Sequence, residues 1–195
     1  MREKTEQENN IISKKTKLKL KTPLTEEDIS YLNAGDEVLL SGIIYGARDA
    51  AHKRIIGSIQ NNETLPFELK GSVIFYVGPS PVPPGRKSGA VGPTTSARMD
   101  SLIEPLLKKG LKGIIGKGDR NDYARELLKK YRCIYFITPG GISAILASKI
   151  QGIKEIAYHD LGPEAVFEIE VRDFPLFVAY DLQGNNIFEL ALRRE

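Results

Sequence analysis

Short apolar runs alternate with polar, turn-forming segments through most of the chain after residue 17. Residues 73–77, 113–116 and 133–137 are almost continuously apolar apart from glycine, and turns and helix-like segments separate them. Continuous apolar runs of this length are typical of strands that are buried on both faces. Their alternation with helices predicts a parallel portion of a sheet.

The flanking segments predict further strands, which add antiparallel pairing. The expected strands are 18–24, 37–45, 153–159 and 168–171, and an expected C-terminal hairpin pairs 177–182 with 187–190 across the turn Gln183–Asn186. The expected helices are a short one that begins at a capping box in Thr25–Asp28 and ends near Asn33, and others at about 96–109, 125–130 and 142–149. The whole pattern predicts a mixed α/β fold with a partly parallel mixed sheet.

Composition places this fold in one domain of a soluble protein. The chain has 195 residues, of which 41% are hydrophobic and 27% are charged. Residues 1–17 are charged and poor in apolar groups, so we expect an N-terminal tail that is mobile or packs on a partner, followed by a single domain over 18–195. No apolar run approaches the roughly 18–20 residues that span a bilayer, and the start lacks the apolar core of a signal peptide. We therefore expect a cytoplasmic protein without a membrane partner.

Charge and cysteine content exclude several other classes of function. The net charge is only +3 and no nucleic-acid-binding motif is present, so a nucleic acid partner is not expected. One cysteine, Cys133, allows no internal disulfide, and with two histidines it forms no metal-ligand spacing. Cys133 lies in the expected strand 132–137, which favours a packed core thiol over a nucleophile or ligand. Any metal in this chemistry would need most of its ligands from another chain.

Candidate chemistry begins in the stretch 91–100, where Thr94, Thr95 and Ser96 stand just before a helix-like run and Arg98 falls in its first turn. Thr95 or Ser96 can cap that helix. The free amides and the positive end of the helix attract an anion, and the planar fork of Arg98 suits a carboxylate. A capped helix with a surface arginine and a carboxylate or phosphate site both fit this stretch.

A second basic segment follows the expected strand 37–45. Residues 48–54 carry four basic-type side chains in seven positions. At helical spacing Arg48 and His52 share one face, and Asp49 is expected to pair with Lys53. The segment fits either a charged helix face or a cationic wall at the end of a strand.

Two glycine-rich turns complete the candidate site. Residues 113–118 form a short strand and a turn with Lys117 at its tip, in an order that matches neither a dinucleotide fingerprint nor a P-loop. Glycines allow close backbone approach to a ligand, and Lys117 supplies a point charge. Residues 138–144 form another strand-to-helix junction and a second possible anion cradle. Between the strands, 79–90 predicts an extended proline-rich connector and a flexible flap.

Together, the runs 46–54, 92–100 and 116–118, followed by 135–141, resemble the beta subunit, or C-terminal domain, of class I iron–sulfur-dependent fumarate hydratases and the related tartrate dehydratases. The resemblance covers about residues 18–190. It implies a swivelling three-layer β/β/α domain and the reversible hydration of fumarate to malate. It also implies a hetero-oligomer in which a cysteine-bearing alpha subunit holds a [4Fe-4S] cluster through three cysteine ligands, a set that a chain with one cysteine cannot supply.

The resemblance also implies roles for individual residues. Thr94 would transfer the proton on carbon, and an acidic residue of the partner would have to activate it because free threonine is a poor base. The substrate-binding residues would be Arg48, Arg98, Lys117 and His52. For His52, orienting Arg48, touching the dicarboxylate and a purely structural role all stay open. Asp49 would position these basic groups, and Thr95 and Ser96 would cap the helix.

The substrate and even the class of function stay open at this level. Residues 46–52 look more like fumarate hydratases than tartrate dehydratases. Mesaconate hydration is also open, because one extra methyl group changes binding in a pocket by only about 1–3 kcal/mol. A different class is a non-catalytic module that binds a dicarboxylate without a cluster-bearing partner.

Overall fold

A computed structural model describes residues 17–80, 85, 89, 91–138 and 143–192. Residues 1–16 of the expected N-terminal tail, most of the expected flap and the glycines of the second possible anion cradle lie outside these residues. Among the described residues, no helix combines the length and apolar character needed to cross a bilayer.

Seven strands form one mixed sheet. Their order is β1 (Leu18–Lys21), β2 (Glu37–Gly46), β3 (Val73–Phe75), β4 (Gly113–Gly116), β5 (Ile134–Ile137), β7 (Val166–Tyr180) and β6 (Ile150–Ala157). The strands from β1 to β5 are parallel to their neighbours, whereas β7 runs antiparallel to β5, β6 and β2. Because β7 pairs with both β5 and β2, the strands β2, β3, β4, β5 and β7 close into a ring. The predicted α/β class and partly parallel mixed sheet are confirmed.

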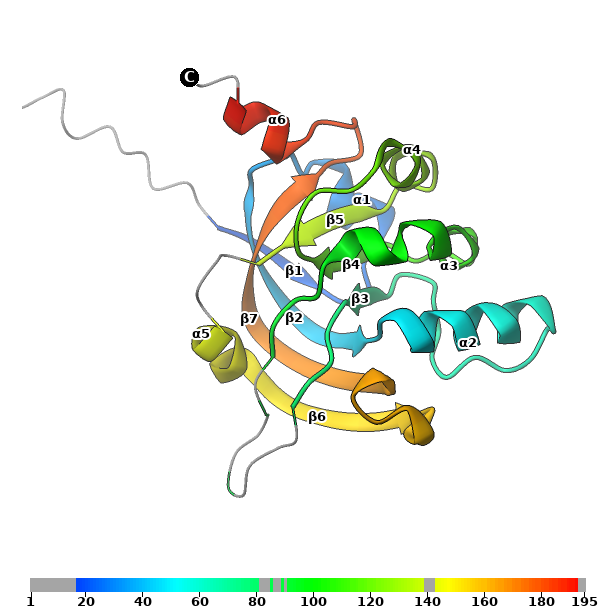
Figure 1. Cartoon of the computed structure of the whole chain (residues 1–195). Coiled ribbons are helices and arrows are strands. Elements are labelled where there is room, and N and C mark those ends of the chain that lie inside the picture. The colour runs from blue at the N-terminus through cyan, green and yellow to red at the C-terminus, as the bar shows by residue number, and fades with distance from the viewer. Residues whose placement is uncertain (1–16, 81–84, 86–88, 90, 139–142, 193–195) are drawn as a thin grey trace, which may run out of the picture.

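Two apolar cores lie on opposite sides of β3, β4 and β5. Val73 and Phe75 of β3 pack in one core against residues of β2 and β7, while Ile74 faces the other core with residues of the helices. This alternation is the period-two pattern of a strand buried on both faces. The result is three layers: the strands β1, β2, β6 and β7, the strands β3 to β5, and then the helices of residues 49–60, 104–108 and 122–130, which lie together on one side in Figure 1.

Helices and short helical turns connect the strands. They are α1 (Glu26–Ser30), α2 (Asp49–Gln60), η2 (Ser96–Leu102), α3 (Glu104–Lys108), α4 (Asp122–Lys130), α5 (Ser143–Lys149), η3 (His159–Glu164) and α6 (Ile187–Leu192), where η marks 3₁₀ geometry. The capping box that begins α1 is confirmed: Thr25 Oγ1 accepts from the Asp28 amide at 3.2 Å, and Asp28 accepts from the Thr25 amide at 2.7 Å. The helix ends at Ser30 rather than near Asn33.

The C-terminal hairpin predicted from the sequence is wrong. Residues 177–180 are the end of the 15-residue strand β7, and the segment expected to return as a strand is the helix α6. β7 already pairs with β5 at this end. Asn186 then starts a helix, because its side-chain oxygen accepts from the Phe188 amide at 2.8 Å and its carbonyl accepts from the Leu190 amide at 3.0 Å.

The single helix expected over 96–109 is divided in two. The 3₁₀ helix η2 ends at Leu102, and α3 begins at Glu104 with Pro105 in its first turn. Proline has no amide hydrogen to donate to a preceding turn, so it suits the start of a helix and not its interior. The division leaves η2 as a separate unit that follows the hydroxyl residues of the candidate site.

Candidate functional site

The three sequence segments proposed for the site meet at the carboxyl ends of the parallel strands. Arg48 follows β2 by two residues, and Lys117 directly follows β4. The hydroxyl segment is hydrogen-bonded between them: the Thr94 amide donates to the Tyr76 carbonyl at 2.7 Å, and the Ser96 amide donates to the Lys117 carbonyl at 3.0 Å. Carboxyl ends of parallel strands are where open α/β sheets bind ligands, because the connecting loops converge there.

Ser96 is a buried link between segments and not a helix cap. Its Oγ accepts a hydrogen bond from the Lys117 amide at 3.0 Å and lies 2.9 Å from the Tyr135 hydroxyl. Thr95 is at the capping position of η2 but makes no side-chain capping bond, so the expected helix cap is absent at both residues. A methyl group on Gly116 would lie only 1.9 Å from Ser96 Oγ, which explains the glycine at the end of β4.

Arg98 joins η2 to the start of α2. Its guanidinium makes two contacts with the Asp49 carboxylate, one from Nε to Oδ1 at 3.0 Å and a shorter one from Nη2 to Oδ2. Asp49 therefore pairs with Arg98 and not with Lys53 as the helical spacing suggested. Partial burial raises the pKa of the Asp49 carboxyl, but the Arg98 contacts outweigh this and lower the pKa below its ordinary value.

Arg48 is held by a carboxylate that sequence reasoning did not single out. Its Nη2 lies 3.1 Å from Oε1 of Glu164, at the end of η3, and the other oxygen of Glu164 accepts from the Ala50 amide at 3.3 Å. The guanidinium packs on the backbone of Gly78, where a Cβ atom would lie 3.0 Å from Arg48 Cζ. Nothing in the sequence near Glu164 indicates this contact, because it depends on where the curved strand β7 begins.

His52 lies behind the site and not on its surface. The side chain is fully buried, its Nδ1 is 3.2 Å from the Arg48 carbonyl, and its ring meets Tyr76 edge-on. Burial lowers the pKa of the imidazole to about 4, so the ring is neutral at pH 7. Its contact is with the backbone of Arg48 and not with the guanidinium.

Thr94 and Lys117 have side chains open to a ligand. Thr94 is half-buried and Lys117 is exposed. Neither the Thr94 hydroxyl nor the Lys117 ammonium bonds or pairs with another described residue. The described edge therefore presents the Thr94 hydroxyl together with three cationic side chains, two of which are held in place by carboxylates. Such a set suits a small anion with more than one carboxylate.

The described residues do not fit an iron–sulfur cluster of their own. Cys133 is buried, and burial raises the pKa of its thiol to about 12, which opposes the thiolate that a cluster ligand must be. No group of three or more His, Cys, Asp or Glu in the described part of the chain is placed to hold a metal. A cluster that took part here would have its ligands on another chain.

A cavity of about 410 Å³ lies on the far side of Arg48, next to η3. It is lined by Pro79, Ser80, Ile153, Glu155, Gly162, Pro163 and Phe167. Its described lining is mainly apolar and holds no lysine or arginine, so this part of the cavity is less suited to a carboxylate than the polar edge. The polar edge around Thr94 and Arg98 is the better candidate for an anion site.

Comparisons with known proteins give one matching family model and several similar relatives. A family model described as "Fumarase C-terminus" matches residues 1–191. The "Putative L(+)-tartrate dehydratase subunit beta" of Methanocaldococcus jannaschii is 41% identical over 172 residues, which make up 85% of this chain and 88% of that protein. Fumarate hydratase 2 of Leishmania major is 38% identical over 180 residues, 90% of this chain but 32% of that protein. The L(+)-tartrate dehydratase subunit beta of Escherichia coli is 34% identical over 177 residues, 86% of this chain and 85% of that subunit.

Proposed function

Because the chain belongs to the fumarase C-terminus family, whose relatives above are hydro-lyases, we propose that it is the beta subunit of a two-chain enzyme that reversibly hydrates fumarate to malate. The active site would be shared with a cysteine-bearing alpha subunit that holds a [4Fe-4S] cluster. The domain would extend over residues 18–195.

One observation carries this proposal: the carboxyl ends of β2 and β4 bring Arg48, Arg98 and Lys117 to the same edge as the Thr94 hydroxyl. Fumarate and malate are dianions, and hydration builds further negative charge on a carboxylate next to the carbon that carries the proton. Fixed cations stabilise such charge more than water does, because they need no reorganisation during the reaction. The Arg98–Asp49 and Arg48–Glu164 pairs hold two of these cations in place.

Thr94 is the residue of this chain that would deliver or remove the proton on carbon. Its amide is bonded to the Tyr76 carbonyl, which fixes the backbone, and its hydroxyl remains accessible. A threonine hydroxyl needs a base to act at neutral pH. Within the described residues no carboxylate contacts Thr94, so an acidic residue of the alpha subunit would supply that base.

Tartrate dehydration is the second candidate, because two of the relatives are named as L(+)-tartrate dehydratase beta subunits. This chain spans most of two tartrate dehydratase subunits but about a third of the Leishmania fumarate hydratase. Both reactions remove or add water at a four-carbon dicarboxylate, so the same cations would serve. The resemblance of residues 46–52 to fumarate hydratases keeps fumarate as the first choice.

The test is co-expression with the candidate cysteine-bearing partner, reconstitution of the cluster without oxygen, and an assay of fumarate loss by its ultraviolet absorbance. Activity that needs both chains supports the proposal. A stable complex that dehydrates tartrate and ignores fumarate supports the second candidate, and failure to form any complex would favour a stand-alone binding module.

Variants then assign the residues of this chain. Arg98→Ala and Lys117→Ala are expected to lower activity by several orders of magnitude, whereas Lys53→Ala, on the exposed face of α2, is the matched control. Thr94→Ala is expected to reduce kcat more than it raises KM, because its proposed role is proton transfer. Near-normal turnover in any of the three site variants would remove that residue from the site.

A further inference from the structure

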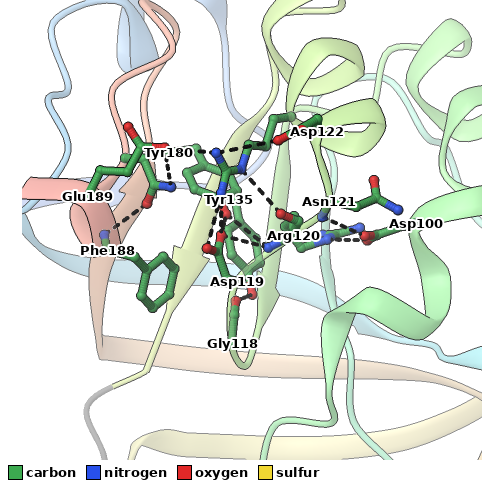
Figure 2. A network of polar contacts seen from close by, with 12 residues as sticks. Asp100, Gly118, Asp119, Arg120, Asn121, Asp122, Tyr135, Tyr180, Phe188 and Glu189 are labelled. Atoms are coloured by element: carbon green, nitrogen blue, oxygen red, sulfur yellow. Dashed lines mark hydrogen bonds and ion pairs between the residues drawn. The ribbon is translucent and has the colours of Figure 1, made fainter. Parts of the chain in front are cut away.

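A buried arginine lies directly beneath the candidate site and has no part in the proposed reaction. Arg120 follows the Lys117 turn, and its side chain is 0% exposed. Its Nε contacts Oδ1 of Asp100 in η2, and the second oxygen of Asp100 accepts from the Asn121 amide at 3.0 Å. Figure 2 shows this cluster between η2, the turn after β4 and strand β5.

Aromatic rings enclose the Arg120 guanidinium. Its central carbon lies 5.1 Å from the centre of the Tyr135 ring and 5.6 Å from that of Tyr76. The Arg120 amide donates to the Tyr180 hydroxyl at 2.9 Å. Among the described residues, neither terminal nitrogen of Arg120 has a hydrogen-bond partner. Ring contact, and not a full set of hydrogen bonds, therefore holds the planar group.

A buried ion pair of this kind contributes little net stability to a fold. Removing two charges from water costs several kcal/mol for each ion, and replacing a buried pair with apolar groups is often neutral or stabilising. A role in fixing one geometry explains the pair better than stability does. The contacts of Asp100 and Arg120 indicate that this geometry is the position of η2 relative to the turn after β4.

The pair joins the two segments that carry the proposed substrate-binding residues. Asp100 is two residues after Arg98 in η2, and Arg120 is three residues after Lys117. Above the pair, Ser96 and Lys117 exchange two hydrogen bonds, each of 3.0 Å. The two segments are thus joined at two levels, at the site by the Ser96–Lys117 hydrogen bonds and beneath it by buried charges.

We propose that Arg120 and Asp100 are positioning residues that set the spacing between Arg98 and Lys117. The proposal rests on the proposed function, since those two cations are the ones that would bind the dicarboxylate. Loss of the pair would leave the cations on the molecule but misplace them, and a shift of about 1 Å can cost a factor of about 100 in rate.

The experiment uses the full chain with the double substitution Asp100→Leu/Arg120→Met, which replaces the charged pair with apolar groups of similar size. Arg132→Met is the matched control, because Arg132 forms an ion pair with Glu26 at 2.6 Å and contacts neither Asp100 nor Arg120. We expect the double variant to unfold in urea near the wild-type midpoint. In the complex, its kcat/KM should fall about 100-fold, with the larger part in KM, while the control stays near wild type.

Hydrogen exchange on the chain alone separates this inference from the proposed function. The Ser96 and Lys117 amides keep their own acceptors in the double variant, so about tenfold faster exchange there, with unchanged exchange in β7, would report lost alignment. If the wild-type complex hydrates no dicarboxylate, the proposed function fails and the exchange rates still decide the inference.

Arg120→Lys keeps the charge but not the planar group between the rings, and serves as the second variant if the double variant does not fold. Like the double variant, Arg120→Lys should speed hydrogen exchange at the Ser96 and Lys117 amides and raise KM. Wild-type exchange together with wild-type KM and kcat, in whichever variant folds, would overturn the proposal.

Discussion

The buried His52 should make the stability of this protein fall steeply in mild acid. Burial is the main reason that the pKa of its imidazole drops from 6.5 to about 4, and the nearby charge of Arg120 acts in the same direction while Asp49 and the Arg48 carbonyl oppose it. Between these two pH values the unfolded chain binds the proton and the folded chain does not. Stability is therefore present above about pH 6.5 and is lost as the pH falls toward 4.

The size of this loss follows from the shift itself. One pKa unit corresponds to about 1.4 kcal/mol, so the folded chain should lose about 2 kcal/mol between pH 7 and pH 5 and about 3 kcal/mol by pH 4 on account of His52. Losses of this size are a large part of the stability of an ordinary domain.

Urea unfolding followed by circular dichroism at pH 7, 6, 5 and 4.5 measures the effect, with wild type compared with His52→Gln. Glutamine can still bond to the Arg48 carbonyl but cannot be charged. Carboxylates with lowered pKa also lose their stabilising effect in acid, and this contribution cancels in the difference between the two proteins. His159→Gln removes an exposed imidazole and is the matched control.

The expected result is a difference between wild type and His52→Gln that changes by about 2 kcal/mol between pH 7 and pH 5. A difference that stays constant over this range would refute the reasoning. So would a magnetic resonance titration of the folded chain in which the His52 ring takes up its proton near pH 6.5.

Three further predictions concern the packing beneath the site. Gly116→Ala should destabilise the chain by about 1–3 kcal/mol in urea unfolding, because the new methyl group meets Ser96 Oγ, whereas Gly57→Ala in α2 has open space and should be neutral or stabilising. Ser96→Ala should lower the free energy of unfolding by about 1–3 kcal/mol, since the Lys117 amide loses its acceptor. Gly116→Ala combined with Ser96→Ala should lower it by less than the sum of the two single changes, and strict additivity would show that the two residues do not meet. Cys133 should resist Ellman's reagent in the folded chain and react fully in urea, and rapid labelling without denaturant would contradict its burial.

Strong local signals made much of the fold predictable. The apolar runs at β3, β4 and β5 and the capping box at Thr25 depend only on neighbouring residues, and the structure confirms them. The C-terminal hairpin failed because residues 187–190 have an apolar pattern that suits a strand or a short helix. Pairing of β7 with β5 and the side chain of Asn186 decided in favour of the helix, and neither contact can be read from spacing.

In the candidate site, as in the fold, features set by neighbouring residues were predictable and contacts between distant segments were not. The glycine-flanked segments predicted that Arg48 and Lys117 follow strands and that Arg98 lies in the first turn of a helix, and parallel pairing brings the ends of β2 and β4 to the same edge of the sheet. The ion pairs could not be predicted in this way. Helical spacing proposed Lys53 as the partner of Asp49, but Arg98 reaches it from a distant segment with a planar group that fits both carboxylate oxygens.

The charges at this edge bear on how the site would bind a dianion. Arg48 and Arg98 are each paired with a carboxylate of this chain, and Lys117 has no paired carboxylate among the described residues. These ion pairs leave part of each guanidinium available to a ligand. Asp49 contacts Nε and Nη2 of Arg98, and Glu164 faces only Nη2 of Arg48. Nη1 of each arginine therefore keeps its hydrogens for a ligand. The pairing does reduce their field, and the edge as a whole carries little more than the single charge of Lys117. A dicarboxylate has two charges and gains a more concentrated one during hydration, so compensation is needed beyond the charges of the described edge. This balance supports an active site completed by a second subunit, with oriented donors supplied here and further positive charge supplied there.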